Sequence, residues 1–436
     1  MEKPQGTHRK RSDIHPKMSP LLRKAVSGMI RRNEGRSASG KLRVIIEFDC
    51  KPSLRMVESL RRSVVTHAHR FEPLRRMSRV YALSAIVSVA CLRRLCRHPN
   101  VLRIHLDSKL KISLNVATPS VGATALQRRG IGGKGIAIAI IDTGAYPHPD
   151  LTRPVNRIVA FKDFVGHRTR TYDDNGHGTH VAGDAAGNGF SSRGKYRGSA
   201  DQAKLVILKA FDKFGDANSS DVIAAVDWVL RNRKKYNIRV VNMSFGSPGV
   251  TRCSDDPICR AAERAWRAGL VVVTAGGNSG PDPRTIESPG ISPLLLTVGA
   301  VNDRRTIRQA DDMVALFSSR GPAAGNRIKP DLTAPGVNIV SLRAPGSTLD
   351  RNYPSARVGN LYFRLSGSSM STPIVSGGAA QLLQRYPALK PEGVKRLLKA
   401  GAFKLRKSPN AVGSGVLNVG FIAKPLLPVV RSRGKI

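Results

Sequence analysis

The sequence predicts an α/β protein whose main domain is a parallel β-sheet with helices on both faces, preceded by a small α+β domain. From Gly135 onward, short and nearly continuous apolar segments alternate with helical stretches, which is typical of a sheet buried on both faces. Before residue 113, short β-branched segments alternate with two helical ones. With 41% hydrophobic and 23% charged residues, the composition is that of a folded protein.

Changes in composition divide the chain into three parts. Residues 1–40 are basic and polar and are expected to form a flexible tail, residues 41–112 the small α+β domain, and residues 113–436 the main domain. The stretch 113–124 is small and polar, which suits a linker. Within the small domain we expect strands at 41–49, 80–84 and 101–107 and helices at 52–63 and 88–97.

The main domain is expected to alternate five strands with five helices. In parallel sheets, active sites gather at the carboxyl ends of the strands, so the residues that follow each strand are of most interest. The strands are expected at 136–141, 204–211, 239–245, 270–276 and 294–301, and the helices at 177–187, 219–235, 257–268, 369–385 and 391–400.

Four residues whose side chains could take part in catalysis lie at such positions. Asp142 follows the first strand and precedes Thr-Gly, and His177 lies between two glycines in DDNGHGTHVAG. Asn278 lies in AGGNSG after the fourth strand, and Ser369 lies in SGSSMSTP where a helix begins. Taken singly, each has a structural interpretation as a turn former, a structural histidine or a helix cap. Together they supply a carboxylate, a base, an amide donor and a nucleophile.

Zinc is the alternative suggested by His177 and His180, which are three residues apart. No glutamate follows in the pattern of metalloproteases, and no cysteine or carboxylate cluster completes a tetrahedral site. We therefore expect no metal at this histidine pair.

The chain order Asp, His, Asn, Ser and the local strings DTG, HGTHVAG, GGNSG and GSSMSTP resemble the signature segments of the subtilase family, peptidase family S8. The strings YPHPDL, DDNGHGTH, FSSRGP and KPDLTAPGVNI are similar to those of AprX-type subtilases. The resemblance covers about residues 113–425. One departure is that Ser368 and Ser371 stand where the family usually has Thr and Ala; both replacements are small.

This resemblance implies a subtilisin-like fold and a serine endopeptidase that needs no cofactor for catalysis. Ser369 would attack the scissile carbonyl, His177 would transfer the proton, and Asp142 would orient His177. The Ser369 backbone N–H and the Asn278 side chain would bind the oxyanion. Protein or peptide substrates are the implied partners.

The family also implies where a substrate lies. An extended peptide would add as a strand between Ser244-Phe245-Gly246 and the segment that begins at Gly215. Glu287 would stand in the wall of the S1 pocket, where a carboxylate favours Arg or Lys at P1. The alternative is that Glu287 turns to solvent or pairs with Arg284.

Two further expectations come from the resemblance. Residues 41–112 resemble the ferredoxin-like propeptide of subtilases, which assists folding and acts as an intramolecular inhibitor; self-cleavage would fall near 108–125, and a permanently attached domain is the alternative. Asp150 matches a family calcium ligand, but the loop 187–196 is basic and poor in carboxylates, so calcium there is weakly supported.

Charge, cysteines and termini leave several alternatives open. With 72 Lys+Arg against 30 Asp+Glu, the net charge is +42, which would also suit a basic scaffold that binds acidic partners. No recognisable nucleic-acid motif surrounds the basic residues, so no specific nucleic acid is expected. Cys253 and Cys259 form either a local disulfide or two free thiols. The N-terminus lacks an apolar signal region and residues 80–92 are too short to span a membrane, which predicts a cytoplasmic protein, with non-classical export as the alternative.

Overall fold

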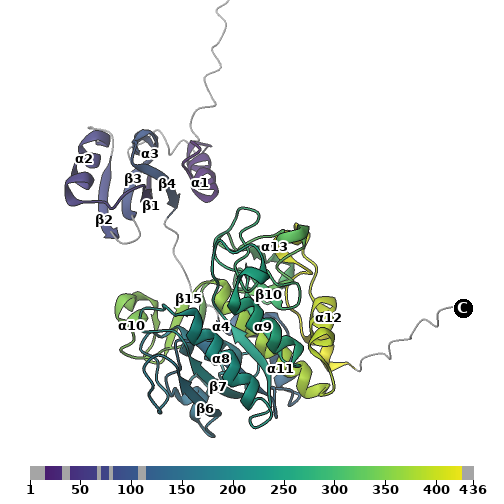
Figure 1. Cartoon of the computed structure of the whole chain (residues 1–436). Coiled ribbons are helices and arrows are strands. Elements are labelled where there is room, and N and C mark those ends of the chain that lie inside the picture. Colours follow the sequence, from purple (N-terminus) through teal and green to yellow (C-terminus); the bar gives the residue numbers. More distant parts are fainter. Residues whose placement is uncertain (1–14, 32–39, 66–69, 78–81, 107–113, 425–436) are drawn as a thin grey trace, which may run out of the picture. The chain divides into compact units, whose positions relative to one another are not determined.

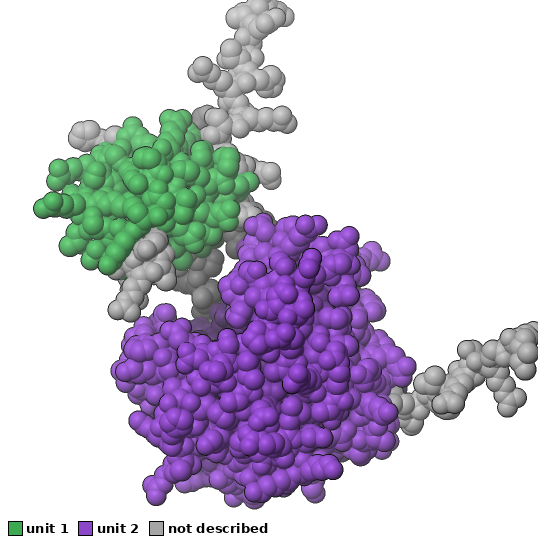
Figure 2. Space-filling model, viewed as in Figure 1, with its two compact units in different colours: residues 1–110 green, residues 111–436 purple. Residues whose placement is uncertain are grey.

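A computed structural model of the chain describes residues 15–31, 40–65, 70–77, 82–106 and 114–424 (Figure 1). The chain forms two compact units, residues 1–110 and 111–436, which Figure 2 shows in green and purple. The sequence predicts the corresponding boundary at 112/113. The self-cleavage region expected near 108–125 lies partly outside the described residues.

The first unit has the ferredoxin-like β-α-β-β-α-β order. Its four strands form one antiparallel sheet in the order β2-β3-β1-β4, and α2 and α3 pack against each other and against the sheet strands. Leu60, Leu83, Leu92 and Ile104 lie in its buried core. The elements are α1 (Pro20–Arg31), β1 (Lys41–Phe48), α2 (Leu54–Val64), β2 (Phe71–Met77), β3 (Ala82–Ser88), α3 (Val89–Arg97) and β4 (Val101–Leu106).

The expectation of a flexible tail over residues 1–40 is wrong for residues 18–31. Met18, Leu22 and Val26 are buried in the core of the first unit, and the last two lie four residues apart on one face of α1. The backbone of Ser19 donates to the carbonyl of Ile104 in β4. Residues 1–40 as a whole are basic and polar, and this overall composition concealed the apolar face of α1.

The second unit is built on an eight-stranded sheet whose order along its main path is β11-β10-β9-β8-β5-β7-β6, with β12 also paired to β10. Every pairing in it is parallel except that of β10 with β11. The strands are β5 (Ala137–Asp142), β6 (Ile158–Asp163), β7 (Lys204–Lys209), β8 (Ile238–Met243), β9 (Val271–Ala275), β10 (Leu296–Asn302), β11 (Met313–Val314) and β12 (Leu332–Pro335).

Helices cover the sheet on both faces (Figure 1). One group contains α7 (His177–Ala186) and α11 (Ser368–Arg385), which contact each other, and the other contains α8 (Ser219–Asn232) and α9 (Pro257–Arg267), which also contact each other. α12 (Pro391–Gly401) contacts α11. The remaining connections contain three short helices: α6 (Pro149–Thr152), α10 (Thr348–Asn352) and α13 (Pro409–Val412). A separate antiparallel sheet is formed by β13 (Ile339–Leu342), β14 (Arg357–Val358) and β15 (Tyr362–Leu365).

The expected linker at 113–124 is also wrong for its described residues. It forms α4 (Leu114–Ser120) and the start of α5 (Ala123–Gln127), and the side chains of Ala117 and Val121 are buried in the main core. Small side chains therefore serve close packing here rather than flexibility.

This topology brings the chemically interesting residues together. β5, β8 and β9 are neighbouring parallel strands, so their carboxyl ends lie at one edge of the sheet. Asp142 ends β5, Ser244 follows β8 and Asn278 follows β9. Among the helices in the described part of the chain, none is long and apolar enough to cross a membrane.

Candidate active site

Asp142 and His177 form a hydrogen-bonded pair. The His177 Nδ1 lies 2.8 Å from Asp142 Oδ1, and the same oxygen accepts the Thr143 backbone N–H at 2.8 Å. Asp142 is buried, whereas 26% of the His177 side chain is exposed. Since an ionised carboxylate only accepts, Nδ1 carries the proton and Nε2 is left as the basic nitrogen.

The electrostatic surroundings of His177 favour its charged form. Burial disfavours the imidazolium, but the charge and hydrogen bond of Asp142, joined by the charges of Asp173 and Asp184, outweigh burial and raise the His177 pKa above its ordinary value. Such a base is held ready to accept a proton from a neighbouring hydroxyl.

A second carboxylate, Asp173, fixes the loop that carries His177. It accepts hydrogen bonds from Thr143 Oγ1 at 3.0 Å, from the Thr179 backbone N–H at 2.8 Å and from the Gly176 backbone N–H at 2.8 Å. Thr143 Oγ1 in turn accepts from the Gly178 N–H at 2.8 Å. Asp173 thereby ties the DTG and HGTH segments together. The role of Asp173 was not predicted from the sequence, although an aspartate pair directly precedes Asn-Gly-His.

Ser369 is the second residue of α11, whose first N–H groups and dipole favour a developing negative charge. Its Oγ donates a 2.7 Å hydrogen bond to the Ser244 carbonyl, which follows β8. No hydrogen bond between Ser369 and His177 occurs among the described residues. Catalytic hydrogen bonds are often absent before substrate binds, so this rotamer is compatible with a nucleophile.

The amide of Asn278 is anchored at its oxygen end. Asn278 Oδ1 accepts from the Ser368 backbone N–H at 2.8 Å and from Ser368 Oγ at 3.1 Å, and Ser368 Oγ also accepts from the Gly277 N–H at 3.3 Å. None of the hydrogen bonds described for this unit uses Asn278 Nδ2, which remains a donor beside Ser369. Ser368, which in the sequence is only a small departure from the family pattern, thus helps to position Asn278.

One of the two predicted substrate segments adjoins Ser369, because Ser369 Oγ donates to the Ser244 carbonyl. Phe245 packs against Phe211 with ring centroids 4.8 Å apart, and Ser247 exchanges two backbone hydrogen bonds with Ser288. Gly215 is exposed and has φ +88°, a left-handed conformation that favours glycine. The segment that follows β8 therefore pairs with residue 288 through Ser247, and Gly215 lies in a separate loop between β7 and α8.

Glu287 directs its carboxylate toward Asn278. Its Oε1 accepts from Ser279 Oγ at 2.8 Å and from the Asn278 backbone N–H at 3.3 Å. A Cβ on Gly246 or on Gly277 would collide with the Glu287 side chain, so the carboxylate lies between these two glycine backbones. The alternative pairing with Arg284 is not found among the described ion pairs.

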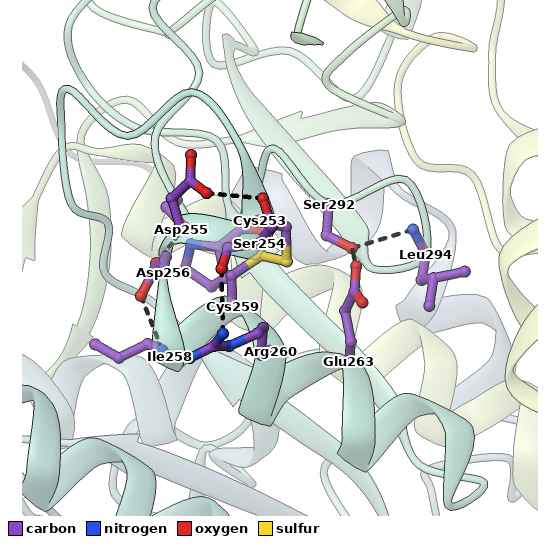
Figure 3. Close-up of a disulfide and its surroundings, with 12 residues drawn as sticks. Cys253, Ser254, Asp255, Asp256, Ile258, Cys259, Arg260, Glu263, Ser292 and Leu294 are labelled. Carbon is purple, nitrogen blue, oxygen red and sulfur yellow. Dashed lines mark hydrogen bonds between the residues drawn. A yellow bond between two sulfur atoms is a disulfide. The ribbon is translucent and has the colours of Figure 1, made fainter. Parts of the chain in front are cut away.

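Cys253 and Cys259 form a disulfide beside this wall, which decides between the two alternatives left by the sequence (Figure 3). Cys259 is buried with Ile286 and Ile291, which flank Glu287. Asp256 caps α9 through a 2.8 Å hydrogen bond from the Ile258 N–H and also accepts from Ser288 Oγ. The bridged loop thus packs behind the segment that carries Glu287.

Glu263 also lies close to the two sulfur atoms, with all three possible ligand atoms within 4.8 Å of one another. Figure 3 shows its carboxylate bonded to Ser292, whose Oγ donates at 2.7 Å. Sulfur in a disulfide is not a thiolate ligand, so this group does not fit a metal while the bond is formed.

The residues around Asp150 do not fit calcium. Asp150 is fully buried; its Oδ1 accepts from the Ser191 N–H at 2.8 Å and its Oδ2 from the Tyr362 hydroxyl at 2.8 Å. Both oxygens are therefore engaged by neutral protein donors, and the basic loop 187–196 supplies no further carboxylate.

The site thus combines a hydrogen-bonded Asp–His pair with a serine in the first turn of a helix, at the carboxyl edge of a parallel sheet. This arrangement is typical of serine peptidases. The chain belongs to the subtilase family of serine endopeptidases, and residues 133–417 match that family. It is 42% identical over 389 residues to "Serine protease AprX" of Bacillus subtilis (strain 168), which covers 87% of each chain. It is 34% identical to "Subtilisin Savinase" of Lederbergia lenta, over 68% of this chain and 94% of that one.

Solved structures give the same result. The structure titled "S41 Psychrophilic Protease" has a TM-score of 0.56 and 31% sequence identity, and the match covers 66% of this chain and 92% of that one. "Sphericase" matches with a TM-score of 0.55 and 29% identity. The expected subtilisin-like fold and AprX-type resemblance are therefore confirmed.

Proposed function

We propose that Asp142, His177 and Ser369 form the catalytic triad of this endopeptidase and that Asn278 completes its oxyanion hole. The observation that carries the proposal is the 2.8 Å bond from His177 Nδ1 to Asp142, which leaves Nε2 as the basic nitrogen. Ser369 lies in the first turn of α11, near the same end of the sheet. No cofactor is needed for this chemistry.

The reaction follows from these positions. When substrate binds, the Ser369 hydroxyl turns from the Ser244 carbonyl to His177 Nε2, which accepts its proton as Oγ bonds to the scissile carbonyl carbon. The Asn278 Nδ2 and the Ser369 backbone N–H donate to the oxyanion. His177 then protonates the leaving amine as the C–N bond breaks, and water hydrolyses the acyl-enzyme by the same route.

Labelling with a fluorophosphonate tests the nucleophile. The wild-type chain is expected to gain one covalent label on Ser369 and to hydrolyse peptides, whereas Ser369→Ala should do neither. Ser366→Ala, which changes an exposed serine three residues earlier, is the matched control and should label normally. Labelling that persists in Ser369→Ala would contradict the proposal.

We also propose that Glu287 favours Arg or Lys at P1. Its carboxylate accepts only neutral donors, lies between Gly246 and Gly277, and has no cationic partner among the described residues. A P1 guanidinium or ammonium would supply that partner, and hydrogen bonds to charged groups are the stronger kind.

Matched peptides with Arg or Phe at P1 test this role. Glu287→Gln should lower kcat/KM for the Arg peptide at least tenfold and leave the Phe peptide nearly unchanged, because one charge-assisted contact contributes about 1.5–3 kcal/mol. Asp282→Asn removes an exposed carboxylate from the same loop and should leave the ratio unchanged. An unaltered Arg/Phe ratio in Glu287→Gln would refute the role.

We further propose that the first unit is a propeptide that assists folding, inhibits the enzyme and is removed by self-cleavage. Support comes from its ferredoxin-like topology and from its own buried core. Parallel sheets form slowly because their contacts are non-local, so a folding aid suits the second unit. Intact mass distinguishes the outcomes: wild type should lose the first unit, and Ser369→Ala should keep it. A wild-type chain that stays whole while active would identify a permanent domain.

A further inference from the structure

A buried lysine lies at the carboxyl end of β7, beside the strand that ends in Asp142. Lys209 is the last residue of β7, and the parallel register pairs it with Asp142 at the end of β5. The Lys209 side chain is only 1% exposed. A buried ammonium is costly unless its three N–H groups find acceptors. The acceptors of Lys209 therefore show what this charge does in the fold.

The Lys209 ammonium donates to acceptors on three segments of the chain. Its Nζ lies 2.8 Å from the Thr143 carbonyl oxygen, 2.7 Å from Asp174 Oδ1 and 2.8 Å from the Phe211 carbonyl oxygen. The centroid of the Tyr172 ring lies 5.1 Å from the same nitrogen. The three donors thus have three acceptors, and the Asp174 carboxylate compensates the charge.

Two of these acceptors belong to the segments that carry the carboxylate and the base. Thr143 directly follows Asp142, and Asp174 lies three residues before His177. The hydrogen bonds from Lys209 therefore connect the end of β5 with the loop that leads into α7. This connection is separate from the one that Asp173 makes through hydrogen bonds that it accepts.

The third acceptor begins the loop that contains Gly215, one of the predicted substrate segments. The Phe211 ring packs against Phe245, with ring centroids 4.8 Å apart, and Phe245 follows Ser244 in the other predicted substrate segment. The Ser244 carbonyl accepts the hydrogen bond from Ser369 Oγ. Through Phe211, the position of Lys209 thus affects both predicted substrate segments.

We propose that Lys209 is a positioning residue for the peptidase reaction, because its ammonium fixes the segment of Asp142, the loop of His177 and the loop of Gly215 relative to one another. This inference rests on the proposed triad, and Lys209 acts only through these neighbours. Lysine suits the position because three donors leave a single atom, whereas the donors of arginine are spread over a planar fork. Methionine has a similar length but would leave all three acceptors without this donor.

The ion pair also predicts an electrostatic effect on His177. If Lys209 loses its charge, the remaining Asp174 carboxylate favours the imidazolium and raises the His177 pKa. If Asp174 loses its charge, the remaining ammonium disfavours the imidazolium and lowers the His177 pKa. The other carboxyl groups that act on His177 are unchanged by either substitution: Asp142, Asp173 and Asp184.

Lys209→Met, Asp174→Asn and the double variant test the proposal, with kcat calculated from the concentration of enzyme that a fluorophosphonate labels. Lys209→Met should lower kcat/KM about 10- to 100-fold, because small displacements of catalytic groups have effects of this size. The pH midpoint of kcat/KM should rise by a few tenths of a unit in Lys209→Met and fall by a similar amount in Asp174→Asn. The double variant should regain the wild-type midpoint but keep the low kcat/KM, since the two carbonyls still lack their donor.

Lys162→Met is the matched control, because it removes an exposed lysine from the neighbouring strand β6 and should leave kcat/KM and its midpoint unchanged. A Lys209→Met enzyme with wild-type kcat/KM would overturn the proposal. A lower kcat/KM with unmoved midpoints in both single variants would also overturn it, since that result describes a residue that only stabilises the fold.

Asp174→Asn decides the question if Lys209→Met does not fold. The Asp174 side chain is 39% exposed, and an asparagine oxygen can still accept from Lys209, so this variant is expected to fold. Its pH midpoint must then fall below that of wild type, and an unmoved midpoint would refute the role of the ion pair. A wild-type chain that neither labels with the fluorophosphonate nor hydrolyses peptides would instead refute the triad, so the two failures are distinguishable.

Discussion

Asn278 is held by its oxygen and presents its nitrogen, which is the orientation that an oxyanion donor requires. We expect Asn278→Ala to lower kcat about 10²- to 10³-fold with little change in KM, a magnitude known for the corresponding donor in subtilisin itself. The reason is that the oxyanion exists only in the transition state. Steady-state kinetics on one peptide substrate measures both constants, and a change confined to KM would assign Asn278 to substrate binding instead.

Ser368 acts on the reaction only through its neighbours, because its hydroxyl contacts Asn278 Oδ1 and the Gly277 N–H. Ser368→Ala should lower kcat about fivefold, since a neutral hydrogen bond contributes about 1 kcal/mol and the Ser368 backbone N–H still holds Asn278. Ser368→Thr keeps the hydroxyl and should restore kcat. If kcat is lowered equally in Ser368→Thr and Ser368→Ala, the Ser368 side chain affects packing rather than the position of Asn278.

The environment of His177 raises its pKa, so its proposed role as general base predicts activity on the alkaline side. Only neutral His177 accepts a proton, so kcat/KM should rise with pH through a midpoint above about 6.5, the ordinary value for histidine. The effect on stability has the opposite sign. Because the folded pKa is raised, protonated His177 stabilises the fold below about pH 6.5, and this contribution is lost as pH rises through the folded pKa. A kcat/KM midpoint below 6.5 would contradict the assignment.

The chemistry-bearing residues could be predicted because short strings carry them. His177 Nδ1 lies 2.8 Å from Asp142 Oδ1, and the catalytic roles of this pair, like those of Ser369, Asn278 and the substrate segments, stay predictions. Asp173 and Ser368 were missed as positioning residues because their importance depends on contacts between distant segments, such as the 3.0 Å bond from Thr143 to Asp173. Neither the hydrophobic periodicity nor the composition of the sequence predicts such contacts.

At the scale of elements, the loop bridged by Cys253 and Cys259 supports the wall that carries Glu287. The double variant Cys253→Ser/Cys259→Ser should unfold with about 2 kcal/mol less free energy, because closing a short loop restricts the unfolded chain. It should also raise KM for P1-Arg peptides several-fold. Thermal melts with and without a dithiol reductant check this: wild type should shift and the double variant should not.

The same melts distinguish the effect of reducing this disulfide from any effect of the reductant on the other cysteines. Cys91 and Cys96 are buried free thiols in the first unit, and a reductant leaves them unchanged. A reductant-dependent shift that persists in the double variant would therefore have to come from a different bond. An unchanged P1-Arg KM in the double variant would show that Ile286 and Ile291 hold the wall without the bridge.

Elements were predictable where burial dominates the sequence pattern. β5, β7, β8 and β9 each contain a mainly apolar run, and each lies within two residues of its expected bounds. β2 (Phe71–Met77) was missed because its sequence, FEPLRRM, contains a proline and adjacent arginines. α1 and α4 were assigned to a tail and a linker because basic or small residues obscure the few side chains that pack.

The whole molecule carries 72 Lys+Arg and 30 Asp+Glu, and its isoelectric point is about 11.2. A net charge of +42 opposes compaction by self-repulsion, although the fold is formed and the family is that of an enzyme rather than of a basic scaffold. Raising the ionic strength from about 0.01 M to 0.15 M shortens the screening length from about 30 Å to 8 Å. We therefore expect Tm to rise by several degrees over this range.

Differential scanning calorimetry of Ser369→Ala in NaCl and in KCl measures this effect without self-digestion. The two salts should act alike, because screening depends on ionic strength and not on the identity of the cation. A polyanion should stabilise the chain at far lower concentration, and this stabilisation should disappear at about 0.15 M salt because counterion release weakens with salt. A Tm that is constant or falls with salt would mean that surface charges are already compensated locally, as they are where Arg343 and Arg357 share Asp350.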